Sequence, residues 1–365
     1  MTRVRVVAAL VAAVVIACTV AAPMASADGA STPATPLPPS AVTVTRDVEF
    51  AHVGGLTLTL DVFASDRPAT GRPALVLVHG GAWGYGKSSD LDAEGALVAR
   101  EGWVGFSISY RLADQTPNPW PDELSDVQRA VRWVGAHATR YGIDPAKIAM
   151  LGLSAGGHLA LLVGELGTAV DGTGRPLTDA DPPVAVKAVA AWSPPTQLSG
   201  LATPPGGNKP PDCGTDSACT AFWSLPYVNH FLGCSPTRCP ARSAQASPTT
   251  RATAAAVPIW WSNATTELVP LIQAERLDRS LTAAGVDHHL DVLNGSGHAD
   301  QNASKIWNDM MAWLAVKMGV PAPPPISFAG RNLLLSPVVV ISVILGLALL
   351  IVLLAVALRD EEGEI

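Results

Sequence analysis

A serine flanked by small residues lies directly after an apolar run. Residues 150–158 read MLGLSAGGH, in which Gly152, Ser154 and Gly156 fit the pattern G-x-S-x-G. A strand-like run precedes this motif and a helical pattern follows it, as a strained strand-to-helix turn requires. Such a turn presents the serine hydroxyl at a helix N-terminus, where the dipole favours developing negative charge. The motif therefore predicts Ser154 as a nucleophile; the alternative is a glycine-rich helix start that Ser154 only caps.

A second glycine-rich loop also follows a strand-like run. It reads VHGGAWG, residues 78–84. Acyl transfer needs backbone N–H donors aimed at the tetrahedral oxyanion, and glycine lets a backbone approach closely enough to supply them. We expect these donors to be the N–H groups of Gly81, Ala82 and Ala155, the last being the residue after the predicted nucleophile. Supporting roles in the two motifs are expected for His79, Gly80, Gly152 and Gly156.

These motifs carry a resemblance to a known family. HGGAWG (79–84), YRLAD (110–114) and YGIDPAKIAMLGLSAGGHLA (141–160), in this order and spacing, resemble the α/β-hydrolase superfamily. The nearest branch is the esterases of the hormone-sensitive-lipase type and their feruloyl- and acetyl-esterase-like (BD-FAE-like) relatives. The resemblance covers about residues 42–318. It implies a doubly wound α/β fold, a Ser–acid–His triad in that chain order, and hydrolysis of carboxylic esters without metal or cofactor.

The resemblance places the catalytic histidine after the last strand. The stretch LNGSGHAD puts His298 there, in a glycine-rich loop that could bring the imidazole over Ser154. His288 and His289 are adjacent within a strand-like run, where a structural role fits better. His158 follows the nucleophile by one helical turn and is expected to pack beneath it. We therefore predict His298 as the general base.

The carboxylate that orients the histidine falls, by the same resemblance, within SNATTELVP, residues 262–270. Thr266 occupies the usual aspartate position and cannot carry the charge that stabilises an imidazolium. Glu267 can, and its longer side chain could compensate for a shift of one residue. Of the other carboxylates, Asp291 lies in the final strand and Asp212 is the first one after WSPPTQ. We predict Glu267 as the acid; the alternative is a solvated loop glutamate beside a slow serine–histidine dyad.

Composition and charge exclude one class of partner. The chain has 365 residues and a formal net charge of −7, with no basic stretch, so nucleic acid is not an expected partner.

The N-terminus, residues 1–27, has the layout of a secretory signal peptide: Arg3 and Arg5, an apolar run, then a small-residue cleavage site at Ala25–Ala27. An uncleaved anchor and a poor lipoprotein site at Cys18 are the alternatives.

The C-terminal region carries the strongest membrane signal. Residues 333–358 contain no charged residue, and roughly 20 apolar residues suffice for a spanning helix. We expect a Pro-rich linker at 28–41, a Pro-rich spacer at 321–332, a single span at 333–358 and a cytoplasmic tail at 359–365. These segments predict a bacterial cell-membrane protein with one C-terminal span and an extracytoplasmic catalytic domain.

Cysteine usage agrees with export. Apart from Cys18, the cysteines cluster in one region: Cys213, Cys219, Cys234 and Cys239. Clustered cysteines in even number in an exported chain are typical of disulfides. Of the three possible pairings we favour the two local ones, first with second and third with fourth. The alternative is a four-thiolate zinc site, but the spacings are wider than those of zinc ribbons and an oxidising compartment disfavours free thiolates.

The body alternates strand-like and helical patterns. Period-two runs open it, and continuous apolar runs with β-branched residues follow, as buried parallel strands require. The strand-like ranges are 42–50, 56–64, 73–79, 105–110, 147–153, 185–193, 257–263 and 288–294. The helical ranges are 88–101, 121–142, 154–166, 271–285 and 299–319. This alternation predicts a mainly parallel, doubly wound sheet over residues 42–320.

One segment breaks the alternation. Residues 196–250 show no clear period, many prolines and all four clustered cysteines. A loop this long inside a compact domain is usually functional, so we expect a disulfide-pinned cap at the C-terminal edge of the sheet, rather than a surface excursion without a binding role.

The leading function is a membrane-anchored serine carboxylesterase acting on small-molecule, lipid or polysaccharide esters. Two alternatives remain open. A catalytically lapsed hydrolase fold serving as a binding module is suggested by the missing aspartate. A serine peptidase or amidase would use the same triad.

Overall fold

The computed structural model describes residues 41–328, except for 68, 179–180, 205–206 and 208. The predicted signal peptide, the transmembrane segment at 333–358 and the tail therefore lie outside the described residues, together with nearly all of the first linker. Within the described part, no helix combines the length and the apolar character that a bilayer crossing needs.

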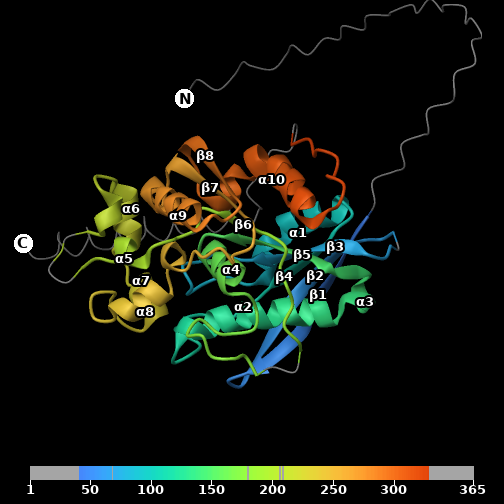
Figure 1. The fold of residues 1–365 in the computed structure, drawn as a ribbon, viewed down its shortest axis with the longest axis horizontal. Coiled ribbons are helices and arrows are strands. Elements are labelled where there is room, and N and C mark those ends of the chain that lie inside the picture. Colours follow the sequence, from blue (N-terminus) through green and yellow to red (C-terminus); the bar gives the residue numbers. More distant parts are fainter. Residues whose placement is uncertain (1–40, 68, 179–180, 205–206, 208, 329–365) are drawn as a thin grey trace, which may run out of the picture. The chain divides into compact units, whose positions relative to one another are not determined.

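Eight strands form one mixed, mainly parallel sheet in the order β1-β2-β4-β3-β5-β6-β7-β8 (Figure 1). The strands β1 and β2 form an antiparallel hairpin, β2 is antiparallel to β4, and the remaining pairs are parallel. Gly54 and Gly55, both at positive φ, make the two-residue hairpin turn. The strands are β1 Val42–Val53, β2 Leu56–Ser65, β3 Arg72–Val78, β4 Val104–Ile108, β5 Ile143–Leu153, β6 Val189–Trp192, β7 Ile259–Thr266 and β8 His288–Ser296.

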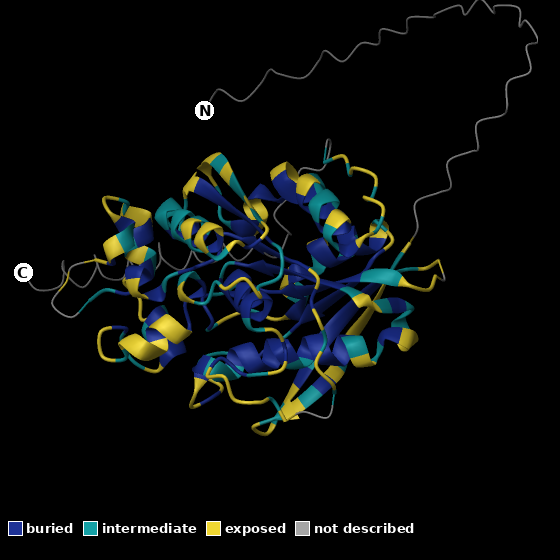
Figure 2. Ribbon diagram, viewed as in Figure 1, coloured by how far each residue is buried: buried dark blue, intermediate teal, exposed yellow. Residues whose placement is uncertain are grey.

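Helices cover both faces of the sheet, as the alternating pattern predicted. On one face α1 (Asp92–Arg100) and α10 (Ala303–Met318) pack over the strands through side chains such as Val98 and Trp307. The other face is covered by α2 (Pro119–Ala136), α4 (Ala155–Leu166) and α9 (Leu271–Ala284). Figure 2 shows the middle strands in dark blue, because both their faces are buried. Continuous apolar runs in β3 and β4 follow from this double covering.

Some element boundaries differ from the predicted ranges. The predicted helix over 88–101 begins as a 3-10 turn, η1 (Ser88–Leu91), before α1. The predicted helix over 121–142 is divided by His137 into α2 and α3 (Ala138–Tyr141). The last helix is preceded by another 3-10 turn, η4 (Ala299–Asn302). These turns shift the ends of elements and leave their order unchanged.

The segment between β6 and β7 contains short helices where the sequence indicated no regular period. They are α5 Leu198–Leu201, η2 Pro211–Cys213, α6 Ser217–Trp223, α7 Tyr227–Leu232, α8 Pro240–Gln245 and η3 Pro248–Thr250. None exceeds seven residues, so none is long enough to display helical periodicity. Figure 1 shows α5–α8 gathered at one end of the sheet. We refer to residues 196–250 as the cap segment.

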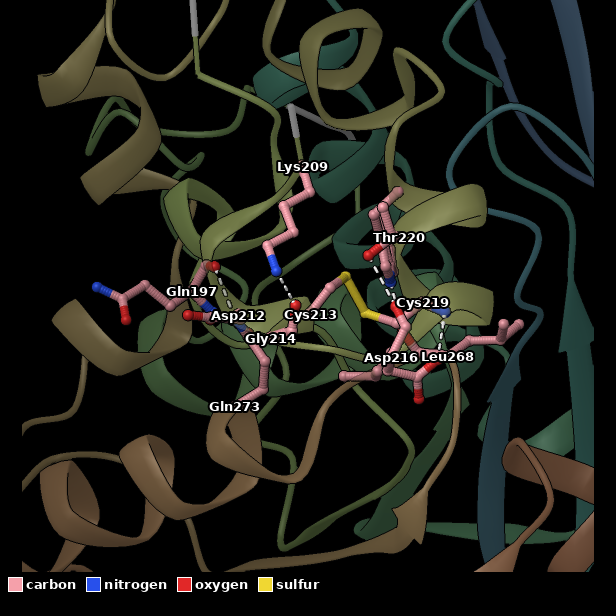
Figure 3. Close-up of a disulfide and its surroundings, with 12 residues drawn as sticks. Gln197, Lys209, Asp212, Cys213, Gly214, Asp216, Cys219, Thr220, Leu268 and Gln273 are labelled. Atoms are coloured by element: carbon pink, nitrogen blue, oxygen red, sulfur yellow. Dashed lines mark hydrogen bonds between the residues drawn. A yellow bond between two sulfur atoms is a disulfide. The ribbon is translucent and has the colours of Figure 1, made fainter. Parts of the chain in front are cut away.

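Two local disulfides hold the cap segment. Cys213–Cys219 joins η2 to α6, and Cys234–Cys239 closes the connection between α7 and α8. Figure 3 shows the first of these, with Asp212 beside Gln273 of α9. All four sulfur atoms are therefore used in disulfides, which excludes the alternative of a four-thiolate zinc site.

Candidate active site

Ser154 occupies the tight turn between β5 and α4. Its backbone has φ 53° and ψ −119°, a region that non-glycine residues rarely adopt. The motif glycines permit this turn, because a Cβ on Gly152 would lie 2.2 Å from the carbonyl oxygen of Gly156. A Cβ on Gly156 would lie 2.2 Å from the carbonyl oxygen of Val78. Larger residues at either position would force β3, β5 and α4 apart.

The loop after β3 is also held in an unusual conformation. Gly81 has φ 109°, and the consecutive residues Ala82 and Trp83 have φ values of 50° and 62°. The N–H groups of Gly84 and Tyr85 both donate to the carbonyl oxygen of Gly81, which closes the turn. The N–H groups of Gly81 and Ala82 make no hydrogen bond to another residue in the described part of the chain. Both residues line the pocket that contains Ser154, so these N–H groups can serve a ligand.

His79 supports this loop, and neither of its ring nitrogens makes a hydrogen bond to Ser154 or His298 among the described residues. Its Nδ1–H donates to the carbonyl oxygen of Gly80 at 2.8 Å, and its ring stacks on Tyr110 with 4.3 Å between centroids. The Tyr110 hydroxyl donates back to the carbonyl oxygen of His79 at 3.1 Å. Burial lowers the pKa of His79 to about 4, so the imidazole is neutral at physiological pH.

Glu267 and His298 form a close pair. The Nδ1–H of His298 donates to Oε2 of Glu267 at 2.6 Å, and the Glu267 side chain is 0% exposed. The second carboxylate oxygen, Oε1, accepts from the N–H of Ala264 at 2.7 Å and from the hydroxyl of Ser193 at 3.0 Å. A buried carboxylate with three donors is fully compensated for its loss of water. Glu267 is thus not a solvated loop glutamate.

The other residues considered for the acid lie elsewhere. Thr266 is exposed, and its hydroxyl donates to the carbonyl oxygen of Gly295 at 2.9 Å. Asp291 contacts His289 at 3.1 Å, and Asp212 accepts from Gln273 and Arg276. None of these three side chains meets His298.

One pocket brings the predicted residues together. Ser154, His298, Gly80, Gly81 and Ala82 all line a hollow of about 390 Å³. With Nδ1 engaged by Glu267, the Nε2 atom of His298 is the nitrogen left to act on the serine. No hydrogen bond joins Ser154 to His298 among the described residues; such contacts often tighten only when substrate binds. The arrangement therefore contains the four components of a serine hydrolase site: a nucleophile, a base, an orienting carboxylate and backbone donors.

The family model BD-FAE matches residues 60–281, which is more than half of the chain. The chain belongs to the BD-FAE family. The match contains the turn that carries Ser154, the loop after β3, the cap segment and Glu267. His298 lies beyond the end of the match.

Individual proteins similar to this BD-FAE member include some that are named as carboxylic ester hydrolases or esterases. The probable carboxylic ester hydrolase LipM of Mycobacterium tuberculosis is 38% identical over 144 residues, which are 37% of this chain and 32% of LipM. The chain thus spans about a third of the length of this curated relative.

Solved structures show the fold. A truncated carbohydrate esterase from gut microbiota aligns with a TM-score of 0.62 at 21% identity, covering 77% of this chain and 98% of that one. The propionate-bound esterase Est2 of Thermogutta terrifontis aligns with a TM-score of 0.58 at 24% identity, covering 79% and 97%. This BD-FAE member therefore has the α/β-hydrolase fold.

Sequence reasoning missed Ser193 in this BD-FAE member. Ser193 follows β6 at φ 51°, and its hydroxyl donates to Glu267 while accepting from the N–H of Ala299 at 2.9 Å. It therefore connects the loop that carries the acid to the loop that carries His298. A serine after a short strand is too common a residue to indicate this role from the sequence. The positive φ that directs its hydroxyl toward Glu267 is visible only in the structure.

The cap segment is attached to both catalytic loops. Trp83, next to Ala82, stacks on Phe231 of α7 at 4.8 Å, and its Nε1–H donates to Nδ1 of His158 at 3.2 Å. Trp223 of α6 donates its Nε1–H to the carbonyl oxygen of Leu268, the residue after Glu267, at 2.5 Å. The cap thus packs against the loop after β3 and is hydrogen-bonded to the acid loop.

His158 lies beneath the nucleophile helix start, as expected. It is fully buried, and burial lowers its pKa to about 4. Its Nε2–H donates to the carbonyl oxygen of Ala246 at 2.7 Å while Nδ1 accepts from Trp83, which fixes the neutral tautomer. It joins the cap to α4 and is not placed to accept a proton from Ser154.

Proposed function

We propose that this chain is a serine carboxylesterase in which Ser154 is the nucleophile, His298 the general base and Glu267 the orienting acid. The observation that carries the proposal is the buried Glu267 carboxylate 2.6 Å from Nδ1 of His298, and His298 in turn lines the same pocket as the strained Ser154. The three donors hold this carboxylate in place and orient the histidine through Nδ1, so that Nε2 is the nitrogen left to act on Ser154.

In the acylation half of the reaction, Oγ of Ser154 forms a bond to the ester carbonyl carbon while Nε2 of His298 accepts the hydroxyl proton. The carbonyl electrons move to the oxygen, which accepts hydrogen bonds from the N–H groups of Gly81, Ala82 and Ala155. Ala155 is the first residue of α4, so its N–H has no partner within the helix. The carbon–oxygen bond to the alcohol then breaks, and Nε2–H gives its proton to the leaving alkoxide.

In the deacylation half, water takes the place of the alcohol. Nε2 of His298 accepts a proton from the water as its oxygen attacks the acyl carbon, and the second tetrahedral oxyanion uses the same donors. The bond to Oγ breaks, the proton returns to Ser154, and the carboxylic acid leaves. Glu267 stays ionised throughout and stabilises the imidazolium through Nδ1–H.

The test is Ser154→Ala in the purified full-length chain with p-nitrophenyl acetate. The variant should lose at least about a thousandfold in kcat, because serine, base and acid act as a unit. A fluorophosphonate probe should label the wild type at Ser154 and not the variant. Hydrolysis unchanged in Ser154→Ala would refute the assignment, and a chain that neither hydrolyses esters nor accepts the probe would favour the binding-module alternative. A p-nitroanilide series run in parallel separates an esterase from an amidase.

We also propose that the catalytic body lies outside the cytoplasm, tethered to a bacterial membrane by residues 333–358. The support is the sequence alone: a signal-peptide layout at 1–27 and an uncharged C-terminal run. Two local disulfides in the body are consistent with an oxidising compartment. Alkaline phosphatase fused after residue 328 should be active in cells and one fused after residue 365 inactive. The opposite pattern, or loss of the body from the membrane fraction, would contradict the tether.

A further inference from the structure

The pocket that contains Ser154 carries charged side chains of one sign. Asp90 and Asp300 line it, and no lysine or arginine is among the described residues of its wall. Its volume of about 390 Å³ is within the usual range of small-molecule sites. A cleft lined by charge of one sign concentrates the electric field inside it, because its low-dielectric walls screen that charge poorly. The charge of this wall therefore affects which esters can bind.

Both carboxylates lie on short turns whose backbone is fixed. Asp90 lies in η1, where its Oδ2 accepts from the N–H of Lys87 at 3.1 Å. Asp300 lies in η4, two residues after His298, and the N–H of His298 donates to Oε1 of Gln301 at 3.0 Å. Both aspartates are exposed, so each carboxylate is open to water or to a ligand.

No neighbouring cation forms an ion pair with this wall in the described part of the chain. Lys87 is exposed and is not bridged to Asp90 or Asp300. The Nζ atom of Lys305, on α10, donates instead to Oδ1 of Asn302 at 2.8 Å. The ion pairs of the described residues include neither aspartate of the wall. The negative charge of the wall is therefore not cancelled locally.

A buried nitrogen in the same wall also lacks a partner. His79 lines the pocket and is 1% exposed, and its Nε2 has no hydrogen-bond partner among the described residues. Because Nδ1–H donates to the carbonyl oxygen of Gly80, Nε2 carries a lone pair. Burial lowers the pKa of His79 to about 4, so the ring adds no positive charge at neutral pH. An unpaired buried acceptor is costly, and a ligand of positive polarity would stabilise it.

The two aspartates act on the same region of the pocket. Glu94 of α1 is 5% exposed; burial raises its pKa to about 7, and the charge of Asp300 contributes to the rise. Asp300 of η4 is thus electrostatically coupled to α1. Since α1 directly follows η1, which carries Asp90, the two turns bring their carboxylates to one side of the pocket.

We propose that this wall makes the enzyme select esters that carry a positive charge, such as a trimethylammonium group, over anionic esters of similar size. Asp90 and Asp300 are then specificity-determining residues. The inference rests on the proposed esterase function and adds a substrate class to it. It holds for a charge in either the acyl or the alcohol part, because the field acts across the whole pocket.

The test compares cationic, neutral and anionic esters of similar shape in the purified full-length chain. The alcohol series is acetylcholine, 3,3-dimethylbutyl acetate and 2-acetoxyethanesulfonate. The acyl series is methyl 4-(trimethylammonio)butyrate, methyl 5,5-dimethylhexanoate and methyl 4-sulfobutyrate. Acid release at constant pH measures kcat/KM for each ester.

At an ionic strength of about 0.01 M, the cationic ester should exceed the anionic one in kcat/KM by at least about tenfold in one series or both. A unit charge about 4 Å away in water changes binding by about fivefold, and the comparison reverses the sign of that charge. At about 1 M salt the screening length falls to about 3 Å, so the ratio should approach one.

Two substitutions remove the charge and keep the shape of the side chain: Asp90→Asn and Asp300→Asn. Each should lower the cation-to-anion ratio by about threefold at low salt, and the double variant should bring it close to one. The neutral ester reports any general loss of activity, and thermal melts check that each variant is folded. The matched control is Asp309→Asn, an exposed aspartate of α10 outside the pocket wall, which changes the net charge equally and should leave the ratio unchanged.

The outcomes separate this inference from the function beneath it. A wild type that hydrolyses neither p-nitrophenyl acetate nor any of the six esters would overturn the esterase proposal itself. Hydrolysis of p-nitrophenyl acetate without a cationic preference in either series would overturn only the charge selectivity. A preference that Asp309→Asn lowers as much as the two pocket variants would assign it to the net charge of the whole protein, and it would refute the role of this wall.

Discussion

The hydroxyl of Ser193 ties together the two loops that supply the acid and the base. It donates to Oε1 of Glu267 and accepts from the N–H of Ala299, next to His298. Ser193→Ala would leave that N–H and one carboxylate oxygen short of a partner, a loss of about 1–2 kcal/mol. We expect kcat for p-nitrophenyl acetate to fall about tenfold with KM nearly unchanged, because the substrate does not touch Ser193.

The control for Ser193 is a second substitution at the same position. Ser193→Gly relieves the positive φ of 51° and also removes the hydroxyl. If the hydroxyl matters, the glycine and alanine variants should share the same loss of kcat. A glycine variant with wild-type kcat would show that only backbone strain was at stake.

Glu267 lies at the residue after the usual aspartate position, and its length lets the carboxylate reach His298. Glu267→Gln should lower kcat by about 10³–10⁴-fold, since an amide cannot stabilise the imidazolium and disturbs the tautomer of the histidine. Thr266→Asp added to Glu267→Ala should not restore activity, because the hydroxyl of Thr266 bonds to Gly295 on β8 and the residue is exposed. Recovery of more than tenfold in the double variant would instead show that the loop can shift by one residue.

The residue types in the sequence could identify some of this site and not the rest. The glycine motifs made Ser154 and the loop after β3 predictable from the sequence. Only glycine fits at such positions, because a Cβ there would lie 2.2 Å from a carbonyl oxygen. Glu267 could be chosen only by elimination, since nothing in SNATTELVP states which way each side chain points. Ser193 could not be found, because its role depends on a backbone conformation and on contacts distant in sequence. The catalytic roles themselves stay predictions for the variants above.

At the scale of elements, α6 supports the loop that carries Glu267. The Nε1–H of Trp223 donates to the carbonyl oxygen of Leu268, and the indole lies 6.2 Å from the ring of Trp83. Trp223→Phe keeps most of the packing and removes the donor. We expect kcat to fall about fivefold while KM for short esters changes little, because a loosened acid loop misplaces His298 without altering the pocket walls.

A buried tryptophan without a hydrogen bond provides the matched control. Within the described part of the chain, Nε1 of Trp261 in β7 is buried and unpartnered. Trp261→Phe therefore removes the same ring volume without removing a bond. Both variants should lower the melting temperature, and only Trp223→Phe should lower kcat. Equal effects of the two variants on kcat would attribute the loss to general loosening of the core.

Short helices escape pattern reading for a physical reason. The helices of the cap segment have at most seven residues, fewer than the two turns over which a 3.6-residue period becomes visible. Their stability comes from burying Trp223 and Phe231 against the rest of the domain and from the two disulfides. The long strands of the sheet and the long helices that cover it show hydrophobic periodicity within their own sequences. Their order could therefore be predicted.

At the scale of the whole molecule, buried carboxyl groups set the response to pH. Burial raises the pKa of Glu94 and Glu101 to about 7 and raises that of Glu123 and Glu165 well above the usual range. The folded state therefore holds protons that the unfolded state has already released. Above pH 4.5 the contribution of these carboxyl groups to the free energy of unfolding falls as pH rises, until each group is deprotonated in both states.

Two buried histidines oppose this trend over a limited range. Burial lowers the pKa of His79 and His158 to about 4, so they favour the folded state increasingly as pH rises from 4 to 6.5. Above about pH 7.5, one unit past the unfolded pKa of about 6.5, both histidines are neutral in the folded and unfolded states. The carboxyl groups alone then determine the slope.

We therefore expect the urea-unfolding midpoint to decrease from pH 6.5 to pH 8.5. Glu123→Gln and Glu165→Gln should each raise the midpoint at pH 6.5 and reduce this slope, because an amide resembles the protonated carboxyl of the folded state and cannot ionise in the unfolded state. Glu49→Gln is the matched control, since Glu49 is exposed at the hairpin and should leave the slope unchanged. A midpoint that rises over this range, or a slope that neither buried variant alters, would show that these carboxyl groups reach water in the folded protein.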